Sequence, residues 1–273
     1  MALWHFPLIT AVLAATPPSP GEPTLSNAED RVVELSGGRT IALRCAGRGK
    51  FTVLLEPGDG GRRTHMTALF AALSGRYHVC AYDRRNVGGS SAAPLPRKAV
   101  DLTEDAFDAL SAAHEHGPYI LFGTSMGGLL VRSYATSHEV AGFVTSNQPG
   151  TSREWSRFAY PLMSPSQRAA DAAWMAGDNN EHIDASDLSR VIDTANPPDI
   201  PYVIMISTER FQCRTAEICG RIYDAFVAAS EAAAQAGKRG RMRVVDGDHD
   251  LYVTNLQDVV AAIDEVASAT QAR

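Results

Sequence analysis

A serine flanked by glycines is the first feature of this sequence that predicts chemistry. Gly123, Ser125 and Gly127 form a G-x-S-x-G pattern between the apolar run YILF and the run MGGLLVRSY. A serine on a tight turn from a strand into a helix projects its hydroxyl, and small neighbours let the backbone fold back. The Met126 amide then points toward negative charge that develops on an attacked carbonyl. The pattern predicts a nucleophile at Ser125; an ordinary serine in a glycine-rich turn is the alternative.

A serine nucleophile needs a base within hydrogen-bond reach. Of the eight histidines, His249 follows the last predicted strand in a short polar turn, GDHD. A turn at the end of a strand is a suitable place for a general base. We therefore predict that His249 is the base, with His182 as the alternative.

Strand-like and helix-like segments alternate along most of the chain. The expected strands follow a hairpin over 31–45 and lie at 51–55, 77–83, 119–122, 141–147, 202–208 and 242–247. The expected helices lie at 64–74, 103–115, 126–137, 215–236 and 255–269, with Thr103 as a candidate N-cap. Strands separated by helices predict βαβ crossovers and an α/β fold with a mostly parallel central sheet flanked by helices.

One long segment, 148–200, departs from this alternation. A structureless loop of that length is improbable in a compact domain, so we expect a small helical cap insertion. It divides the core into 29–147 and 201–273. Its aromatic residues predict a partly apolar binding pocket, for which we select three side chains: Trp155, Phe158 and Trp174.

Composition excludes several classes of protein. The 273 residues are 45% hydrophobic and 21% charged, which is typical of a globular protein and not of a disordered or coiled-coil chain. A net charge of −6 is unfavourable for binding nucleic acid. Residues 1–28 combine an apolar stretch with a proline-rich one, which indicates a signal peptide or a flexible N-terminus, and the stretch is too short for stable membrane insertion. No spacing of cysteines and histidines suggests a zinc site.

Four stretches resemble the serine hydrolases of the α/β-hydrolase superfamily. They are LLEPGDGG at 54–61, YDRRNVGGSS at 82–91, ILFGTSMGGLLVRSYA at 120–135 and VVDGDHDLYVTNLQDVVAAIDEV at 244–266. The resemblance covers residues 30–270. It implies a catalytic triad in the chain order serine, acid, histidine, with no cofactor and no metal ion.

The acid is less clearly marked than the other two members. The resemblance offers the end of strand 141–147, where this chain has Asn147, or the loop after strand 202–208, where it has Glu209. We predict Glu209. Three aspartates beside His249 are expected to be too close in sequence to reach its Nδ1: Asp246, Asp248 and Asp250.

The resemblance also implies a second oxyanion donor in the glycine turn after strand 51–55. We predict the backbone amide of Asp59, with Gly60 or Gly61 as the alternative donor. Asp83 and Arg84 of the YDRR motif are expected to brace loops rather than to touch substrate.

The four cysteines permit two disulfides. Cys45 and Cys80 lie in strand-like runs that could be sheet neighbours, and they match cysteine positions of exported actinobacterial members of the superfamily. A Cys213–Cys219 bond would close a small loop. The resemblance therefore implies a secreted or cell-envelope protein, with a cytoplasmic enzyme holding four buried thiols as the alternative.

These features predict a serine esterase that hydrolyses an ester, lactone or thioester of a small, partly apolar molecule through an acyl-enzyme on Ser125. The same scaffold also resembles C–C bond hydrolases, aminopeptidases and acyltransferases. A non-catalytic ligand-binding homologue is a further alternative, since a fold alone does not fix function. The sequence does not specify an oligomeric state.

Overall fold

The computed structural model describes residue 28, residues 30–209 and residues 216–271, and for 216–219 only the helical backbone. The strands within these ranges are β1 (Asp30–Glu34), β2 (Thr40–Ala46), β3 (Thr52–Glu56), β4 (His78–Tyr82), β5 (Tyr119–Thr124), β6 (Gly142–Ser146), β7 (Tyr202–Ser207) and β8 (Gly240–Val245). The α helices are α1 (Thr67–Ser74), α2 (Ala99–Ala112), α3 (Met126–Ser137), α4 (Ser152–Phe158), α5 (Pro165–Met175), α6 (Ala185–Thr194), α7 (Ala216–Gln235), α8 (Leu251–Thr254) and α9 (Leu256–Gln271). Short 3-10 turns are η2 (Ser36–Gly38), η3 (Arg63–Met66) and η4 (Tyr160–Leu162).

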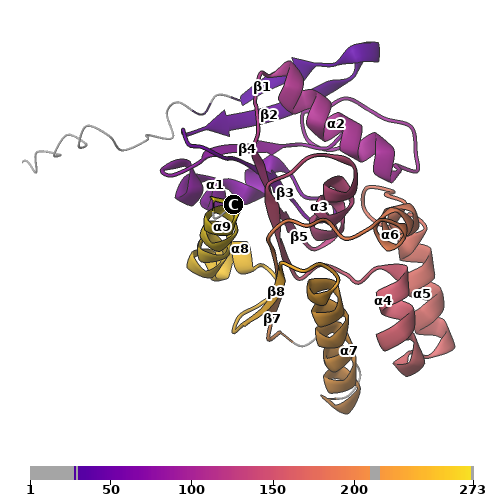
Figure 1. Ribbon diagram of the computed structural model, residues 1–273. Coiled ribbons are helices and arrows are strands. Elements are labelled where there is room, and N and C mark those ends of the chain that lie inside the picture. The colour runs from indigo at the N-terminus through magenta and orange to yellow at the C-terminus, as the bar shows by residue number, and fades with distance from the viewer. Residues whose placement is uncertain (1–27, 29, 210–215, 272–273) are drawn as a thin grey trace, which may run out of the picture.

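The strands form a single twisted sheet in the order β1-β2-β4-β3-β5-β6-β7-β8 (Figure 1). β1 pairs with β2, and β2 with β4, in antiparallel directions, whereas every pair from β4 through β8 is parallel. The α/β-hydrolase fold predicted from the sequence is confirmed. Because the carboxyl ends of parallel strands meet at one edge, the loops after β3, β5, β6, β7 and β8 gather there.

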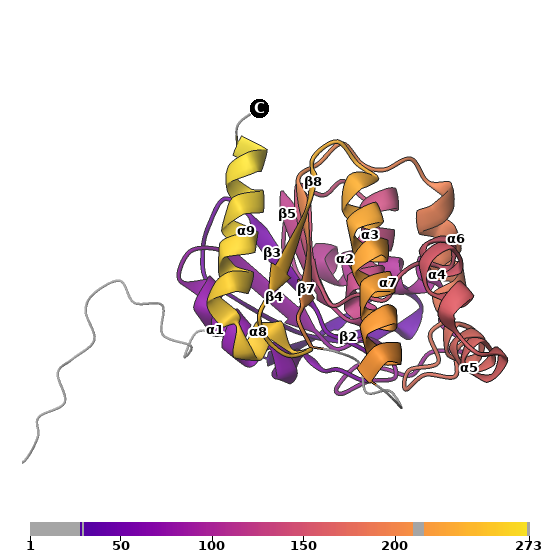
Figure 2. The ribbon, with the colours of Figure 1, turned by 90° about the horizontal axis from the view of Figure 1, so that it is seen from below.

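Helices cover both faces of the sheet (Figure 2). α1 and α9 pack on one face, and α2 and α3 pack on the other. Leu54 of β3 faces the α2–α3 layer, while Val53 and Leu55 face the α1–α9 layer. This alternation with both faces buried explains why the parallel strands are continuous apolar runs.

Between β6 and β7 the chain forms α4, η4, α5 and α6. α6 packs against α3, and α4 packs against α7. Helix α4 begins with a capping box in which Thr151 accepts from the Glu154 amide and the Glu154 carboxylate accepts from the Thr151 amide. The same arrangement at Ser164 and Gln167 begins α5.

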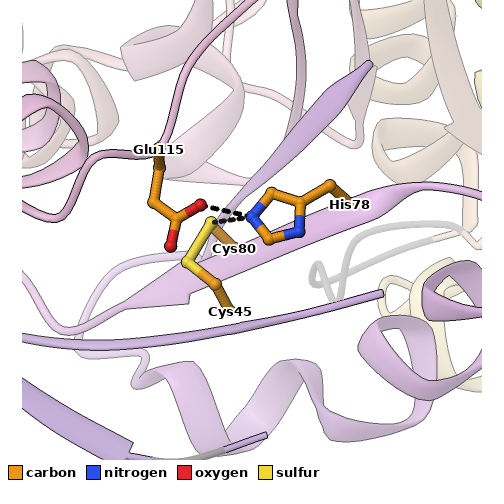
Figure 3. Close-up of side chains that lie close together, drawn as sticks. All are labelled: Cys45, His78, Cys80 and Glu115. Atoms are coloured by element: carbon orange, nitrogen blue, oxygen red, sulfur yellow. Dashed lines mark hydrogen bonds and ion pairs between the residues drawn. A yellow bond between two sulfur atoms is a disulfide. The ribbon is translucent and has the colours of Figure 1, made fainter. Parts of the chain in front are cut away.

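A disulfide joins Cys45 of β2 to Cys80 of β4 (Figure 3). The two residues are direct partners in the antiparallel register, with their Cα atoms 4.2 Å apart. The predicted sheet neighbours are therefore bonded as expected. The Cys213–Cys219 prediction lies outside the residues whose side chains the structure describes.

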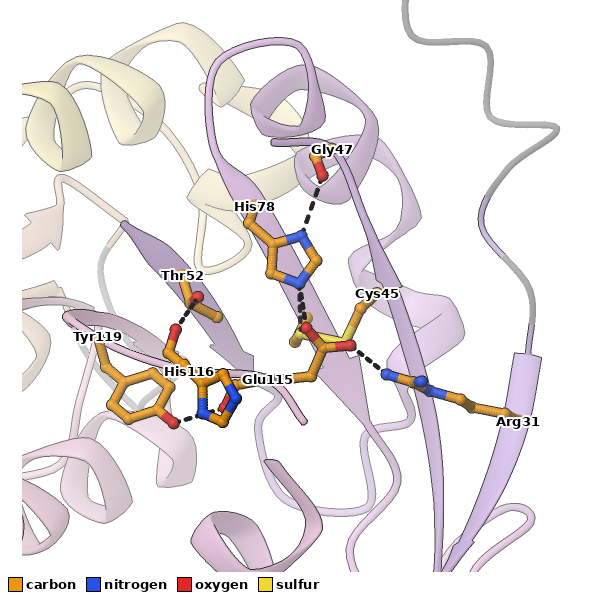
Figure 4. The surroundings of a disulfide bond; sticks show 9 residues. Arg31, Cys45, Gly47, Thr52, His78, Glu115, His116 and Tyr119 are labelled. Carbon is orange, nitrogen blue, oxygen red and sulfur yellow. Dashed lines mark hydrogen bonds and ion pairs between the residues drawn. A yellow bond between two sulfur atoms is a disulfide. The ribbon is translucent and has the colours of Figure 1, made fainter. Parts of the chain in front are cut away.

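His78 and Glu115 lie beside the disulfide, so four potential metal-ligand atoms fall within 4.8 Å of one another (Figure 3). Both sulfur atoms are consumed by the disulfide and are not thiolates, which are the form that binds metal. The Glu115 carboxylate pairs with His78 and also with Arg31 of β1 (Figure 4). We therefore assign this cluster a structural role, in which it ties the N-terminal hairpin to the end of β4 away from Ser125.

Within the part of the chain that the structure describes, none of the helices combines the length and the apolar character needed to cross a lipid bilayer.

Candidate active site

Ser125 occupies a strained turn between β5 and α3. Its backbone has φ 52° and ψ −124°, a conformation that residues other than glycine rarely adopt. The Ser125 amide donates to the Ser146 carbonyl at 2.8 Å, which ties the turn to the end of the neighbouring strand β6. A non-glycine residue held in such a conformation is a frequent feature of functional sites.

Gly123 and Gly127, which flank Ser125, lie so close to other backbone atoms that neither position has room for a side chain. A Cβ atom at Gly123 would lie 2.2 Å from the Gly127 carbonyl oxygen. A Cβ atom at Gly127 would lie 2.3 Å from the Glu56 carbonyl oxygen and 2.5 Å from that of Pro57. The G-x-S-x-G pattern is thus explained by the packing of the turn on itself and on the end of β3.

The two backbone amides predicted to bind an oxyanion are those of Met126 and Asp59. Met126 is the first residue of α3, so its amide has no partner within the helix. Gly58 lies against the nucleophile, because a Cβ atom there would be 3.3 Å from Ser125 Cβ and 3.9 Å from its Oγ. The next amide along the chain is that of Asp59.

Gly60 and Gly61, the alternative donors to Asp59, both use their amides in hydrogen bonds within the protein. The amide of Gly60 donates to the Glu181 carboxylate at 2.7 Å, and the amide of Gly61 donates to the Gly58 carbonyl at 3.0 Å. The Asp59 carboxylate accepts from the Asn180 amide at 3.0 Å, so it is held toward residues 180–181. The Gly60 and Gly61 amides thus have partners within the protein, and the Asp59 amide stays the predicted second donor.

The loop that carries His249 is fixed by Asn147, which follows β6 and has a φ of 46°. The Asn147 side-chain amide donates to the His249 carbonyl at 2.8 Å, and its oxygen accepts from the Ser207 amide at 2.8 Å. Asn147 thus joins the ends of β6 and β7 to the histidine loop. Its side-chain amide both donates and accepts in these contacts, whereas an ionised carboxylate could only accept.

Glu209 reaches the histidine loop through the backbone. Its Oε2 accepts from the His249 amide at 2.5 Å. The imidazole Nδ1 instead lies 2.9 Å from Asp250 Oδ1. The expectation that Asp250 is too close in sequence to reach Nδ1 is wrong, because the tight turn just before α8 brings the two adjacent side chains together.

Ser125 and His249 line one cavity of about 310 Å³. Among the described residues, no hydrogen bond joins the Ser125 hydroxyl to the imidazole, which is 47% exposed. Catalytic hydrogen bonds are often long without substrate and tighten when it binds. The cavity is lined by Ser125, Asn147, Pro149, Trp155, Trp174, Ser207, Glu209, Phe226 and His249.

Two of the three predicted pocket aromatics lie in this cavity, and the third does not. Trp155 and Trp174 line it, with the Trp155 indole N–H donating to Asp171. Phe158 lines a separate cavity of about 300 Å³, so its predicted place in the pocket is wrong. Three residues advance a helix by about 300°, which turns Phe158 roughly 60° away from Trp155.

His182, the alternative base, is outside the residues that line the Ser125 cavity. Its Nδ1 contacts the Gly177 carbonyl at 3.1 Å, and its φ is 53°. His182 therefore stabilises a turn between α5 and α6.

Arg84 and Asp83 brace loops, as predicted. The Asp83 carboxylate accepts from the Arg63 amide at 2.8 Å and from the Gly89 amide at 3.0 Å. Arg84, which is 1% exposed, pairs with two buried carboxylates, Glu56 and Glu181.

Burial raises the pKa of the Glu56 carboxyl above its ordinary value, although Arg84 opposes the shift. The Tyr82 hydroxyl donates to the same carboxylate, and burial raises the pKa of this tyrosine well above its ordinary value. The neutral phenol is therefore available as a donor to Glu56.

Glu181 and Asn180 were missed by sequence reasoning. Their local pattern is that of polar residues between two helices, and it carries no signal that they reach residues 57–61. The nearest signal is the unusual Glu56-Pro57 pair, since a buried carboxylate requires a cation. Arg84 in the YDRR motif supplies it.

Comparison with known sequences gives a partial match. A family model described as the alpha/beta hydrolase fold matches residues 52–179. A probable transporter from Hormonema carpetanum is 33% identical over 89 residues, which are 32% of this chain and 13% of that protein. A probable 1-acylglycerol-3-phosphate O-acyltransferase from Oryza sativa subsp. japonica is 32% identical over 91 residues, 32% of this chain and 22% of that protein. The chain spans less than a quarter of the length of these curated relatives.

Solved structures extend the likeness over most of the chain. An esterase from Thermogutta terrifontis superposes with a TM-score of 0.59 and 17% identity, covering 89% of this chain and 99% of that one. An enol-lactonase from Burkholderia xenovorans gives a TM-score of 0.57 and 18% identity, covering 87% and 100%. At these identities the likeness shows the fold. Together with the family model, it shows that this chain has the α/β-hydrolase fold.

Proposed function

We propose that this protein is a serine hydrolase that cleaves an ester, lactone or thioester of a small, partly apolar molecule. The observation that carries the proposal is the position of Ser125: it sits on a strained, glycine-flanked turn and opens into an aromatic-lined cavity shared with His249. A cavity of about 310 Å³ matches a small organic molecule better than a polymer segment.

In the proposed reaction, Ser125 Oγ attacks the acyl carbonyl while His249 accepts the hydroxyl proton. The amides of Met126 and Asp59 stabilise the tetrahedral oxyanion. His249 then gives its proton to the leaving alcohol or thiol, and an acyl-enzyme remains. Water then attacks the acyl-enzyme while His249 accepts its proton. His249 returns that proton to Ser125 Oγ as the bond to the acyl group breaks, which releases the acid and restores Ser125.

The acid partner of His249 is proposed to be Glu209, which lines the cavity and already holds the histidine backbone. Asp250 is the competitor, because it contacts Nδ1 in the structure. Exposed ion pairs such as His249–Asp250 contribute little on their own. Substitution of each carboxylate by its amide separates the two: Glu209→Gln is expected to lower kcat by at least about 100-fold and Asp250→Asn by less than about 10-fold. The reverse ranking would assign the role to Asp250.

The test of the function is labelling by a fluorophosphonate, which reports an activated serine without requiring the natural substrate. We expect one covalent adduct by intact-mass spectrometry, mapped to the peptide that holds Ser125 and lost in Ser125→Ala. A panel of aryl esters, lactones and thioesters then identifies the hydrolysed bond. Absence of an adduct on protein with intact circular dichroism would favour the ligand-binding alternative.

The local similarity to a probable plant acyltransferase favours acyl transfer as a second candidate. In that reaction an alcohol, not water, would accept the acyl group from Ser125. Hydrolysis in the presence of added glycerol or short alcohols separates the two, because a transferase gives new ester in preference to free acid.

We also propose a secreted or cell-envelope location. The Cys45–Cys80 disulfide supports it, since such bonds persist in oxidising compartments. The N-terminal sequence of the protein recovered from culture medium, membrane and cytosol fractions would test this placement.

A further inference from the structure

The segment between α5 and α6 is bound to the loop at residues 57–61 that follows β3. Asp59 accepts from the Asn180 side chain at 3.0 Å and from the Glu181 amide at 3.2 Å. Glu181 accepts in return from the Gly60 amide at 2.7 Å. We call these contacts between 180–181 and 59–60 the clasp.

Arg84 lies beneath the clasp with all five of its N–H donors engaged. Nε donates to Glu181 at 2.8 Å, and a second donor pairs with the other Glu181 oxygen. A third donor pairs with Glu56. The last two bind backbone carbonyls, that of Pro57 at 2.8 Å and that of Gly58 at 2.6 Å. Five donors are the full capacity of a guanidinium, so its orientation is fixed by this set.

The bond from Arg84 to the Gly58 carbonyl has a geometric consequence for the neighbouring amide. The Gly58 C=O and the Asp59 N–H belong to one planar trans peptide, in which the two groups point in opposite directions. Arg84 holds the carbonyl on its own side of that peptide. The Asp59 N–H must therefore point away from Arg84, and Gly58 lies directly against Ser125.

We propose that Glu181, acting through Arg84, is a positioning residue that fixes the Gly58–Asp59 peptide as the second oxyanion donor. The insertion thus contributes to reactivity as well as to the pocket wall. Glycine allows the adjoining peptide to rotate at low cost, so an unrestrained Gly58 carbonyl could exchange places with the Asp59 amide. The Gly58 carbonyl accepts from the Gly61 amide at 3.0 Å, and the bidentate pair between Arg84 and Glu181, both at most 5% exposed, adds a second, charged restraint on this rotation.

This inference depends on the proposed function, because it assigns a role in oxyanion binding. The test compares Glu181→Gln with wild type in ester hydrolysis and in fluorophosphonate labelling. We expect kcat to fall by about 10- to 100-fold with KM changed less than about 3-fold, because loss of one oxyanion donor costs about 100- to 1,000-fold and the glutamine keeps part of the contact. Glu181 is absent from the residues that line the Ser125 cavity, so substrate binding itself is spared.

Asp193→Asn is the matched control. Asp193 is another carboxylate of the insertion, but it bonds to Thr151 and Arg153 instead of the clasp. Its removal should leave kcat within about 2-fold of wild type. An equal loss of kcat in both variants would show that any disturbance of the insertion slows the reaction, and would overturn a specific role for Glu181.

Two further variants keep the proposal testable if Glu181→Gln fails to fold. Arg84→Lys keeps the charge but loses the planar fork, so we expect a loss of kcat at least as large. Asn180→Ala removes only an exposed contact to Asp59 and should slow labelling a few-fold at unchanged stability. Labelling at the wild-type rate in every folded variant would refute the inference.

Hydrogen exchange distinguishes failure of the inference from failure of the proposed function. Glu181→Gln removes the charge and one of the two acceptor oxygens, which should speed amide exchange in the peptide covering 57–61, whether or not Ser125 is reactive. If wild type is not labelled, the proposed function fails, and the clasp is judged from exchange alone. If wild type is labelled but Glu181→Gln exchanges and reacts like it, the positioning role is refuted and the proposed function stands.

Discussion

Gly127→Ala sets two physical effects of opposite sign against each other. Gly127 is the second residue of α3, where alanine should stabilise the helix by up to about 1 kcal/mol. The new methyl, however, would lie 2.3 Å from the Glu56 carbonyl oxygen, below the 3.0 Å that real Cβ contacts respect. The end of β3 must then retreat by 0.7 Å, from 2.3 to 3.0 Å. Because the obstructing atoms belong to the backbone of a central strand, we take the cost of overpacking at about 3 kcal/mol.

The expected net effect is a loss of about 2 kcal/mol in the free energy of unfolding. The displaced strand end leads directly into Gly58 and Asp59, so fluorophosphonate labelling of Ser125 should slow by about 10- to 100-fold. Urea unfolding measures the loss in the free energy of unfolding. The second-order rate constant of labelling, measured well below the unfolding transition, gives the effect on the reactivity of Ser125.

Gly37→Ala separates lost stability from lost geometry. Gly37 has a φ of 74° in the turn between β1 and β2, and a Cβ there meets nothing within 4 Å. Alanine in that conformation costs roughly 1–2 kcal/mol, with no effect expected on labelling. If Gly127→Ala were as stable as wild type, or labelled as fast as Gly37→Ala, close packing of the turn on β3 could not explain the glycine.

Three further outcomes are expected. Replacing Cys45 and Cys80 together by alanine should lower the free energy of unfolding by about 4 kcal/mol in urea titrations, because the bond spans 35 residues; a loss below about 1 kcal/mol would contradict this account. A hydrogen bond from Arg63 holds the pKa of Asp30 below its ordinary value of 3.8. The ionised Asp30 therefore stabilises the fold above pH 3.8, and this contribution to stability is lost as the pH falls through the lowered pKa. Asp30→Asn should therefore be less stable than wild type at pH 6, with the difference vanishing toward pH 2 in thermal unfolding. Trp174→Ala should raise KM for aryl esters about 10-fold with little change in kcat, and an unchanged KM would remove Trp174 from the binding pocket.

Local features of the sequence were sufficient to predict the strands of the sheet and the strained turn at Ser125. Parallel strands buried on both faces are recognisable as apolar runs, and the glycines around Ser125 report a close approach that no side chain permits. The predicted start of the helix at 103 is wrong: α2 begins at Ala99, so Thr103 is not its N-cap. Thr103 instead bonds back to the Ala99 carbonyl at 2.7 Å, and the Asp101 carboxylate caps the Lys98 amide.

The sequence alone therefore determined the α/β class and the turn that holds Ser125, because these depend on periodicity and on steric limits that act within a few residues. For Cys45 and Cys80 the sequence offered a possible pair, and the register of β2 on β4 decided it. Only the tertiary structure decided that Asp250 contacts the imidazole, that Phe158 faces another cavity and that Glu181 reaches the loop at 57–61. Such contacts depend on the directions that loops and helix ends take in space, which no pattern within a few residues specifies.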